Sequence, residues 1–148
     1  EICKMQERVV LVEDTPELQC TAEDYLPLRT SDFIGMAGLL RGTLRSSPKR
    51  IVVGEVRGEE ALSLLDAWST GHGGGCSTVH SNSAVQTLKR LENMVSRVSL
   101  TPQQQTIAEA VDIIVYLRMK GMRRYVDEII GVDGYDEVKH CYITHEIL

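Results

Sequence analysis

The feature that most constrains the fold is a short apolar run that ends abruptly in charged residues, Arg50-Ile51-Val52-Val53-Gly54-Glu55-Val56-Arg57. Adjacent β-branched residues without alternating polar positions are typical of a strand buried on both faces, as in a parallel sheet. A second run of this kind, RVVLVE, covers residues 8–13. Two such strands require helices or loops over both faces of one sheet, so the sequence predicts an α/β protein.

The remaining chain supplies the helices and strands that this class needs. We expect residues 15–31 to cross the top of the sheet without regular structure, and Ser31 or Asp32 to cap a helix that carries Phe33, Met36, Ala37, Leu40 and Leu44. Further helices are expected over 58–70, over 84–98 behind the cap Ser83, and after Pro102. Further strands are expected over 76–80, 112–119, 124–132 and 138–143. This order predicts a parallel α/β core with an antiparallel β extension at the C-terminus.

Length and charge narrow the class further. The 148 residues fit one compact domain, and the net charge of −5 argues against charge-driven binding of nucleic acid. No apolar run has the length of a membrane span, and no signal peptide opens the chain. Because the first residue is Glu1, we expect a piece of a longer protein. The four cysteines (Cys3, Cys20, Cys76 and Cys141) are scattered, which favours reduced thiols over a disulfide framework or a zinc site.

Ionisable side chains follow three of the expected strands. Glu13 and Asp14 end the first, Glu55 ends the second, and His80 ends the strand at 76–80. Ligands of open α/β sheets bind at the carboxyl ends of the strands, where these groups converge if the sheet is parallel. Two carboxylates and an imidazole suit a hydrolytic site with a metal-held water shell and a phosphate. Glu55 and Arg57 taken alone fit equally well as the first solvated turn after a strand.

Three segments resemble the motifs of the secretion-superfamily traffic ATPases, the hexameric motors of type IV secretion, conjugal DNA transfer, type II secretion and type IV pili. RVVLVEDTPEL (8–18) is similar to their Asp box, RIVVGEVR (50–57) to Walker B, and TGHGGGCSTVHSN (70–82) to the His box. The resemblance covers roughly residues 8–132. The eight-residue step from His72 to His80 resembles the type IV secretion and conjugal-transfer branch more than the pilus and type II branch.

The resemblance implies a RecA-like three-layer αβα core and a role for each matching residue. Glu55 would be the Walker B acid that orients or deprotonates water, and Glu13 and Asp14 would support Mg²⁺ through its water shell. His80 would sense the γ-phosphate of ATP with His72 beside it. Two sets of alternatives stay open. Arg57 would anchor the Walker B turn or contact phosphate across a subunit boundary, and Arg41 and Arg45 would contact a neighbouring subunit or form surface salt bridges. Lys49 departs from the family pattern, which has Asp after the proline.

The phosphate-binding loop of the family is missing. No GxxxxGK[ST] sequence occurs, and GHGGGCST (71–78) has cysteine where the lysine must stand. We therefore expect residues 1–148 to be a partial RecA-like ATPase domain that lacks Walker A and the N-terminal domain. Alone it would bind and hydrolyse ATP weakly or not at all. The longer protein would be a homo-hexamer in the cytoplasm, peripheral on the bacterial inner membrane, working with other components of the secretion machine.

Other functions are weighed against this one. The chain could be an assembly module without enzymatic activity that carries the motifs as inherited sequence. A metal hydrolase using His72, His80 and Glu55 is disfavoured because no HxxxH or HExxH spacing occurs. His72 could also simply cap the helix that ends near Gly71.

Overall fold

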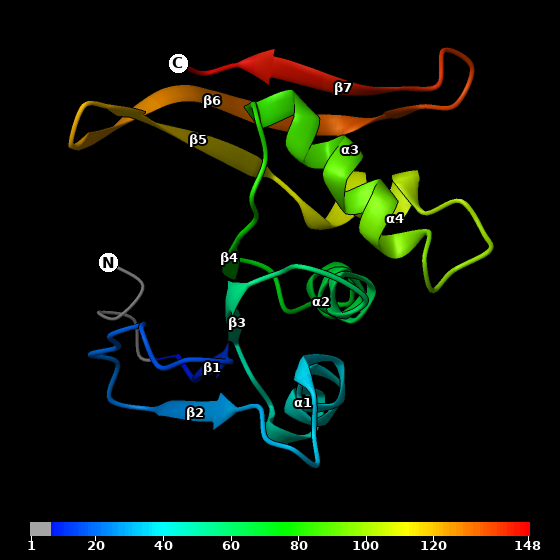
Figure 1. The fold of residues 1–148 in the computed structure, drawn as a ribbon. Helices are drawn as coiled ribbons and strands as arrows, with labels where there is room; N and C mark the ends of the chain where they lie inside the picture. The colour runs from blue at the N-terminus through cyan, green and yellow to red at the C-terminus, as the bar shows by residue number, and fades with distance from the viewer. Residues whose placement is uncertain (1–6) are drawn as a thin grey trace. The chain divides into compact units, whose positions relative to one another are not determined.

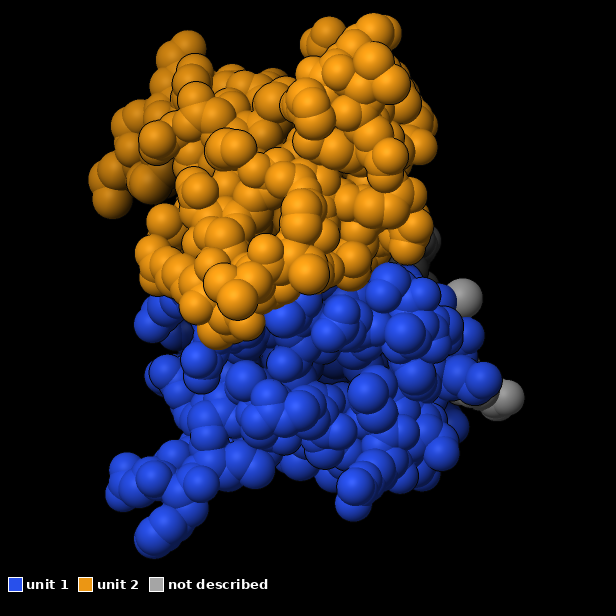
Figure 2. All heavy atoms as spheres, turned by 90° about the vertical axis from the view of Figure 1, so that its right-hand side faces the viewer, with its two compact units in different colours: residues 1–79 blue, residues 80–148 orange. Residues whose placement is uncertain are grey.

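The structure is a computed structural model that describes residues 7–148 (Figure 1). Its contacts divide the chain into two compact units (Figure 2). The first unit ends at Val79, and the second begins at His80. Each unit contains a sheet of its own. The sequence led us to expect one compact domain, and the division arises because the parallel and antiparallel sheets share no strand.

A parallel sheet of four strands forms the first unit, in the order β2-β1-β3-β4. Its strands are β1 (Val9–Glu13), β2 (Tyr25–Arg29), β3 (Arg50–Glu55) and β4 (Cys76–Thr78). Leu11 pairs with Pro27 on one side and with Val52 on the other, which places β1 and β3 side by side in the interior of the sheet. Both strands predicted to be buried are therefore present, and all five residues of β1 are buried.

The two faces of this sheet are covered differently. Val9, Leu11 and Val52 form a buried cluster with Ala22, and Cys20 packs against it, so the loop before β2 covers that face. The helices α1 (Met36–Thr43) and α2 (Glu60–Ser69) pack against each other and lie on the same side of the sheet in Figure 1. Residues 7–79 thus supply one helical layer, where a three-layer core has two.

Two sequence predictions about residues 15–46 are wrong. Residues 25–29 are not part of an irregular excursion but form β2, whose alternating exposure and Pro27 are typical of an edge strand. Neither Ser31 nor Asp32 caps the next helix, because Ser31 pairs with Ile34 in an isolated bridge and α1 begins only after Gly35. Phe33 is 99% exposed and contributes nothing to a buried helical face.

The second unit combines a helix pair with an antiparallel sheet. Helices α3 (Ala84–Val95) and α4 (Gln104–Ala110) pack on the strands β5 (Ile113–Lys120) and β6 (Arg123–Asp136), and β7 (Cys141–Glu146) completes the sheet. The predicted cap is confirmed, since the Ser83 hydroxyl accepts a bond from the Gln86 amide at 3.2 Å. The predicted last strand, 138–143, begins three residues later because residues 137–140 form a turn with His140 at φ 53°.

The predicted class, a parallel α/β core followed by an antiparallel β extension, is confirmed by the two sheets. Within residues 7–148, no helix is both long and apolar enough to cross a membrane. Cys76 and Cys141 are exposed thiols, and Cys3 lies outside the described residues.

The helix α3 separates buried from exposed apolar residues, which gives a matched test of the second unit. Leu88 is fully buried, whereas Val85 is 56% exposed. Leu88→Ala should lower the free energy of unfolding by about 2–5 kcal/mol, since it removes buried methyl groups and leaves a cavity. Val85→Ala should change it by about 0.5 kcal/mol or less. Urea unfolding followed by circular dichroism measures both, and equal losses would contradict the assigned faces.

Candidate functional site

The carboxyl ends of β1 and β3 open into one cleft of about 740 Å³ in the first unit. Glu13 and Asp14 reach it from β1, and Glu55 and Arg57 reach it from β3. The two strand ends lie at one edge of the sheet because β1 and β3 pair in parallel, with Val12 beside Val53. The residues lining the cleft are Glu13, Asp14, Thr15, Glu17, Leu18, Thr30, Ser31, Asp32, Gly35, Met36, Gly54, Glu55, Arg57, Glu60 and Thr78.

Glu13 is a buried carboxylate that holds the loop after β1. Only 5% of its surface is exposed. Its Oε1 atom accepts bonds from the backbone amides of Glu17 at 3.0 Å and Leu18 at 2.7 Å. These bonds satisfy one oxygen of a buried charged group, which is otherwise costly to remove from water. The carboxylate thus fixes the floor of the cleft, whatever further role it has.

Asp14 lies at the surface beside Glu13 and joins the ends of β1 and β2. The Thr30 hydroxyl donates to Asp14 Oδ1, and the Thr30 amide donates to the Glu13 carbonyl at 3.2 Å. The loop after β2 is thereby held against the acidic end of β1. Thr30 was not singled out by sequence reasoning, because the segment that forms β2 has only a weak strand pattern.

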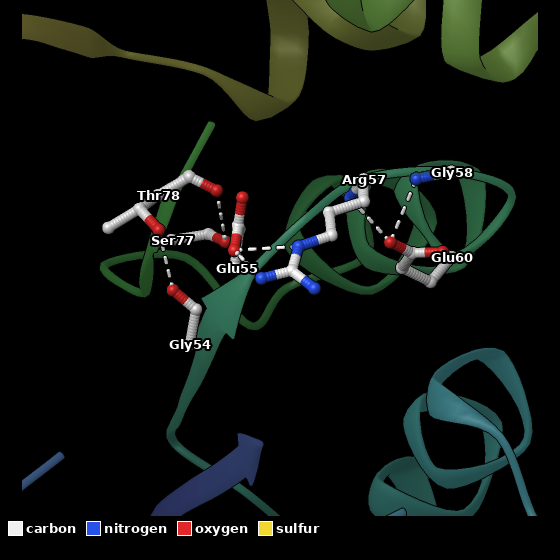
Figure 3. Close-up of polar contacts among 7 residues, drawn as sticks. All are labelled: Gly54, Glu55, Arg57, Gly58, Glu60, Ser77 and Thr78. Carbon is white, nitrogen blue, oxygen red and sulfur yellow. Dashed lines mark hydrogen bonds and ion pairs between the residues drawn. The ribbon is translucent and has the colours of Figure 1, made fainter. Parts of the chain in front are cut away.

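Glu55 and Arg57 form an ion pair at the end of β3 (Figure 3). Arg57 Nε donates to Glu55 Oε2 at 2.7 Å, and Nη2 lies 2.5 Å from the same oxygen. The carboxylate raises the pKa of the Arg57 guanidinium, first by this bond and then by its charge. The Glu55 side chain is 20% exposed and that of Arg57 is 72% exposed. Glu55 therefore lies in the wall of the cleft, while Arg57 covers it from solvent.

Glu60 fixes the turn between β3 and α2. Its Oε1 accepts bonds from the backbone amides of Arg57 at 2.6 Å and Gly58 at 2.9 Å (Figure 3). A carboxylate in the first turn of a helix binds amides that have no partner inside the helix. Sequence reasoning missed this residue. A usable signal was an acidic residue in the first turn of the expected helix.

The two histidines of the His box have different surroundings. His72 Nδ1 lies 3.2 Å from the Ala67 carbonyl, where the ring caps the last turn of α2. Helix capping is the structural role that the sequence analysis gave as the alternative to a catalytic role for His72. His80 is the first residue of the second unit and lines a separate cavity of about 550 Å³ with Gln86, Lys89 and Arg90. That His80 meets the carboxylates of the first unit stays a prediction.

Arg41 and Arg45 follow each other along one exposed edge of the first unit. Arg41 lies in the last turn of α1, and Arg45 in the short 3₁₀ segment Leu44–Ser46. Both are exposed, and neither appears in an ion pair within the described part of the chain. The choice between contact with a neighbouring subunit and surface salt bridges stays a prediction for both arginines.

The acidic residues that line the cleft are possible metal ligands. No group of three or more His, Cys, Asp or Glu side chains among residues 7–148 converges closely enough to hold a metal ion directly. This remains compatible with Mg²⁺, which keeps several waters and binds through few carboxylates.

The class defined by this fold and cleft is a parallel α/β protein with an acidic site at the carboxyl edge of its sheet. Residues 1–125 match the family described as Type II/IV secretion system protein. Since this match covers most of the chain, the chain belongs to that family, and the predicted resemblance to secretion traffic ATPases is confirmed.

Individual relatives come from conjugation and type IV secretion. The chain is 50% identical over 129 residues to the conjugal transfer protein TrbB of Rhizobium radiobacter, covering 87% of this chain and 40% of that protein. It is 33% identical over 147 residues to the type IV secretion system protein PtlH of Bordetella pertussis, covering 87% of this chain and 43% of that protein. The chain thus spans less than half the length of these relatives.

A solved structure agrees with the fold. The VirB11 ATPase from the Brucella suis type IV secretion system, in complex with sulphate, superposes with a TM-score of 0.74 at 27% identity. The superposition covers 83% of this chain and 39% of that one. The pilus retraction motor PilT with bound ADP, at 24% identity and a TM-score of 0.64, supports the fold alone.

Removing the Glu60 carboxylate should destabilise the first unit. Glu60→Ala leaves two backbone amides without their acceptor and should lower the free energy of unfolding by about 1–2 kcal/mol. Glu59→Ala is the matched control, because Glu59 is exposed and makes no side-chain bond at this cap. Urea unfolding followed by the fluorescence of Trp68, the one tryptophan of the chain, reports this unit. Equal stability of the two variants would contradict the role of Glu60.

Proposed function

We propose that this chain is the C-terminal portion of the motor domain of an ATPase that powers type IV secretion or conjugal DNA transfer. The observation that carries the proposal is the cleft, in which two neighbouring parallel strands end in Glu13, Asp14 and Glu55. TrbB and PtlH support the choice of branch, since their names assign them to conjugal transfer and type IV secretion. The two units together would be a partial RecA-like domain.

Glu55 is the proposed catalytic acid. As a general base or water-orienting group it has to present an oxygen to the cleft at the end of the Walker B strand. The ion pair with Arg57 engages Oε2 and gives the carboxylate a defined place. Arg57 therefore acts in our proposal as the anchor of the Walker B turn, and its exposed guanidinium is also able to reach a phosphate brought by a neighbouring subunit.

Magnesium fits this half of the site as a water-coordinated ion. When bound, Mg²⁺ would neutralise phosphate charge, and Asp14 and the second oxygen of Glu13 would accept bonds from its waters. Glu13 Oε1 is already used by two backbone amides. The direct ligands would come from the nucleotide and from the phosphate-binding loop, which this sequence does not contain.

The histidines and the exposed arginines complete the proposal. His80 would contact the γ-phosphate of ATP. His72 would belong to the nucleotide site through the segment that follows α2, whose last turn it caps by its contact with the Ala67 carbonyl. Arg41 and Arg45, exposed and without an ion pair within residues 7–148, would contact the next subunit of a homo-hexamer. The assembled motor would lie in the cytoplasm on the inner membrane with other components of the secretion machine.

Nucleotide affinity tests the missing half of the site. Backbone amides at a helix N-terminus and a lysine supply most phosphate binding in this class of enzyme, and neither is present in a GxxxxGK[ST] loop here. Calorimetric titration of the 148-residue chain with Mg·ATP should give a dissociation constant of about 1 mM or weaker, near the limit of detection. Micromolar affinity with steady turnover would overturn the proposal that a separate phosphate-binding loop is needed.

Glu55→Gln tests the catalytic assignment in a longer protein that contains this chain and a phosphate-binding loop. Loss of the carboxylate should lower kcat by about 10²-fold or more, because an amide cannot accept a proton from water. Steady-state ATP hydrolysis measures this, and size-exclusion chromatography with light scattering should show unchanged assembly. The control is Glu59→Gln, the same change at an exposed position outside the cleft. Unchanged hydrolysis in Glu55→Gln would instead favour an assembly module without catalysis.

A further inference from the structure

The pairing of β3 with β4 is irregular at the residue before Glu55. Val52 pairs with Cys76 and Val53 with Ser77, but the next pair is Glu55 with Thr78. Gly54 is thus an extra residue in β3 with no partner of its own in β4. Such a bulge bends a strand and changes the direction of the side chains that follow, and bulges are frequent next to active sites.

The bulge decides where the Glu55 side chain goes. In an unbroken strand, Glu55 would share the face of Ile51 and Val53, which are 0% and 1% exposed. A carboxylate on that face would lie among apolar side chains at a high desolvation cost. The inserted residue removes Glu55 from this alternation, and the carboxylate instead lines the cleft beside Arg57 (Figure 3).

Thr78 contacts the chain on both sides of Glu55. Its hydroxyl donates to the carbonyl of Gly54 at 2.7 Å (Figure 3). Its own carbonyl accepts from the amide of Val56 at 2.9 Å. The carbonyl of the bulged residue thereby accepts a bond from a side-chain hydroxyl of the neighbouring strand. The backbone bond is available to any residue at position 78, whereas the bond to Gly54 requires a hydroxyl.

We propose that Thr78 is a positioning residue for the proposed hydrolysis, because its hydroxyl holds the bulge that directs the Glu55 carboxylate into the cleft. Thr78 is not proposed to touch the nucleotide. It acts on the backbone of Gly54 and through it on Glu55, and this role rests on the function proposed for Glu55.

Three variants separate the hydroxyl from the rest of the side chain. Thr78→Val keeps the shape and the β-branch but removes the donor. Thr78→Ser restores the donor on a smaller side chain. Ser77→Ala removes a neighbouring hydroxyl that lies outside the cleft and donates, at 3.5 Å, to the Thr78 carbonyl and not to Gly54. Thr78 is exposed, so its replacement by valine leaves no cavity in the core.

In the longer protein, Thr78→Val should lower kcat for ATP hydrolysis about 10-fold, as expected when one hydrogen bond that orients a reacting group is lost. KM should change less than about two-fold, because the hydroxyl acts on a step after binding. Thr78→Ser should recover most of kcat, and Ser77→Ala should match the unmodified protein. Unchanged kcat in Thr78→Val, or no recovery in Thr78→Ser, would overturn the proposal.

A second readout does not depend on hydrolysis. In the 148-residue chain, the carbonyl ¹³C resonance of Gly54 reports the bond from Thr78, and the Nε–H resonance of Arg57 reports the position of the Glu55 carboxylate. Both should shift in Thr78→Val and return in Thr78→Ser. If the longer protein hydrolyses no ATP but both resonances shift, the proposed function fails, while the role of the Thr78 hydroxyl in holding the bulge at Gly54 stands. If neither resonance shifts, the Thr78 hydroxyl does not hold the bulge, and the proposal is wrong.

Discussion

The parallel pairing of β1 with β3 is the constraint on which the rest of the first unit depends. Both strands are buried over their apolar runs, Val9–Val12 in β1 and Ile51–Val53 in β3, and both end in acids. Parallel neighbours bring like ends together, so burial of the apolar runs alone places Glu13 and Glu55 at one edge. The loop anchored by Glu13 and the turn anchored by Glu60 then shape the cleft around that edge.

The parts of the fold that sequence predicted well are those with strong, local patterns. β1, β3 and α3 were recognised because an unbroken apolar run, or an apolar repeat behind a serine cap, has few alternative structures. The strand ends were predicted to form a site for a related reason, since a buried strand has no structural need for an acid at its end. The motifs of the secretion ATPases coincide with these strand ends and strengthened the prediction without being its source.

What sequence did not predict depends on contacts between distant segments. β2 exists because β1 offers it a pairing edge, and its alternating exposure with Pro27 gives only a weak strand pattern. Thr30 and Thr78 are ordinary hydroxyl residues until the pairing of strands brings one to Asp14 and the other to Gly54. The bulge at Gly54 is likewise a property of the β3–β4 pair, and no single strand encodes it.

The negative charge of the cleft indicates which part of the proposed ATPase site these residues would form. Among the described residues its lining holds six carboxylates (Glu13, Asp14, Glu17, Asp32, Glu55 and Glu60) and one cationic side chain, that of Arg57, which is paired with Glu55. Such a surface would repel a triphosphate, so under the proposed function another part of the motor would capture the nucleotide. It suits the opposite task of ordering water and holding the water shell of a cation. In the proposed motor, Mg²⁺, a phosphate-binding loop and neighbouring subunits would supply the positive charge that brings phosphate to the cleft, and hydrolysis would then depend on assembly of the motor.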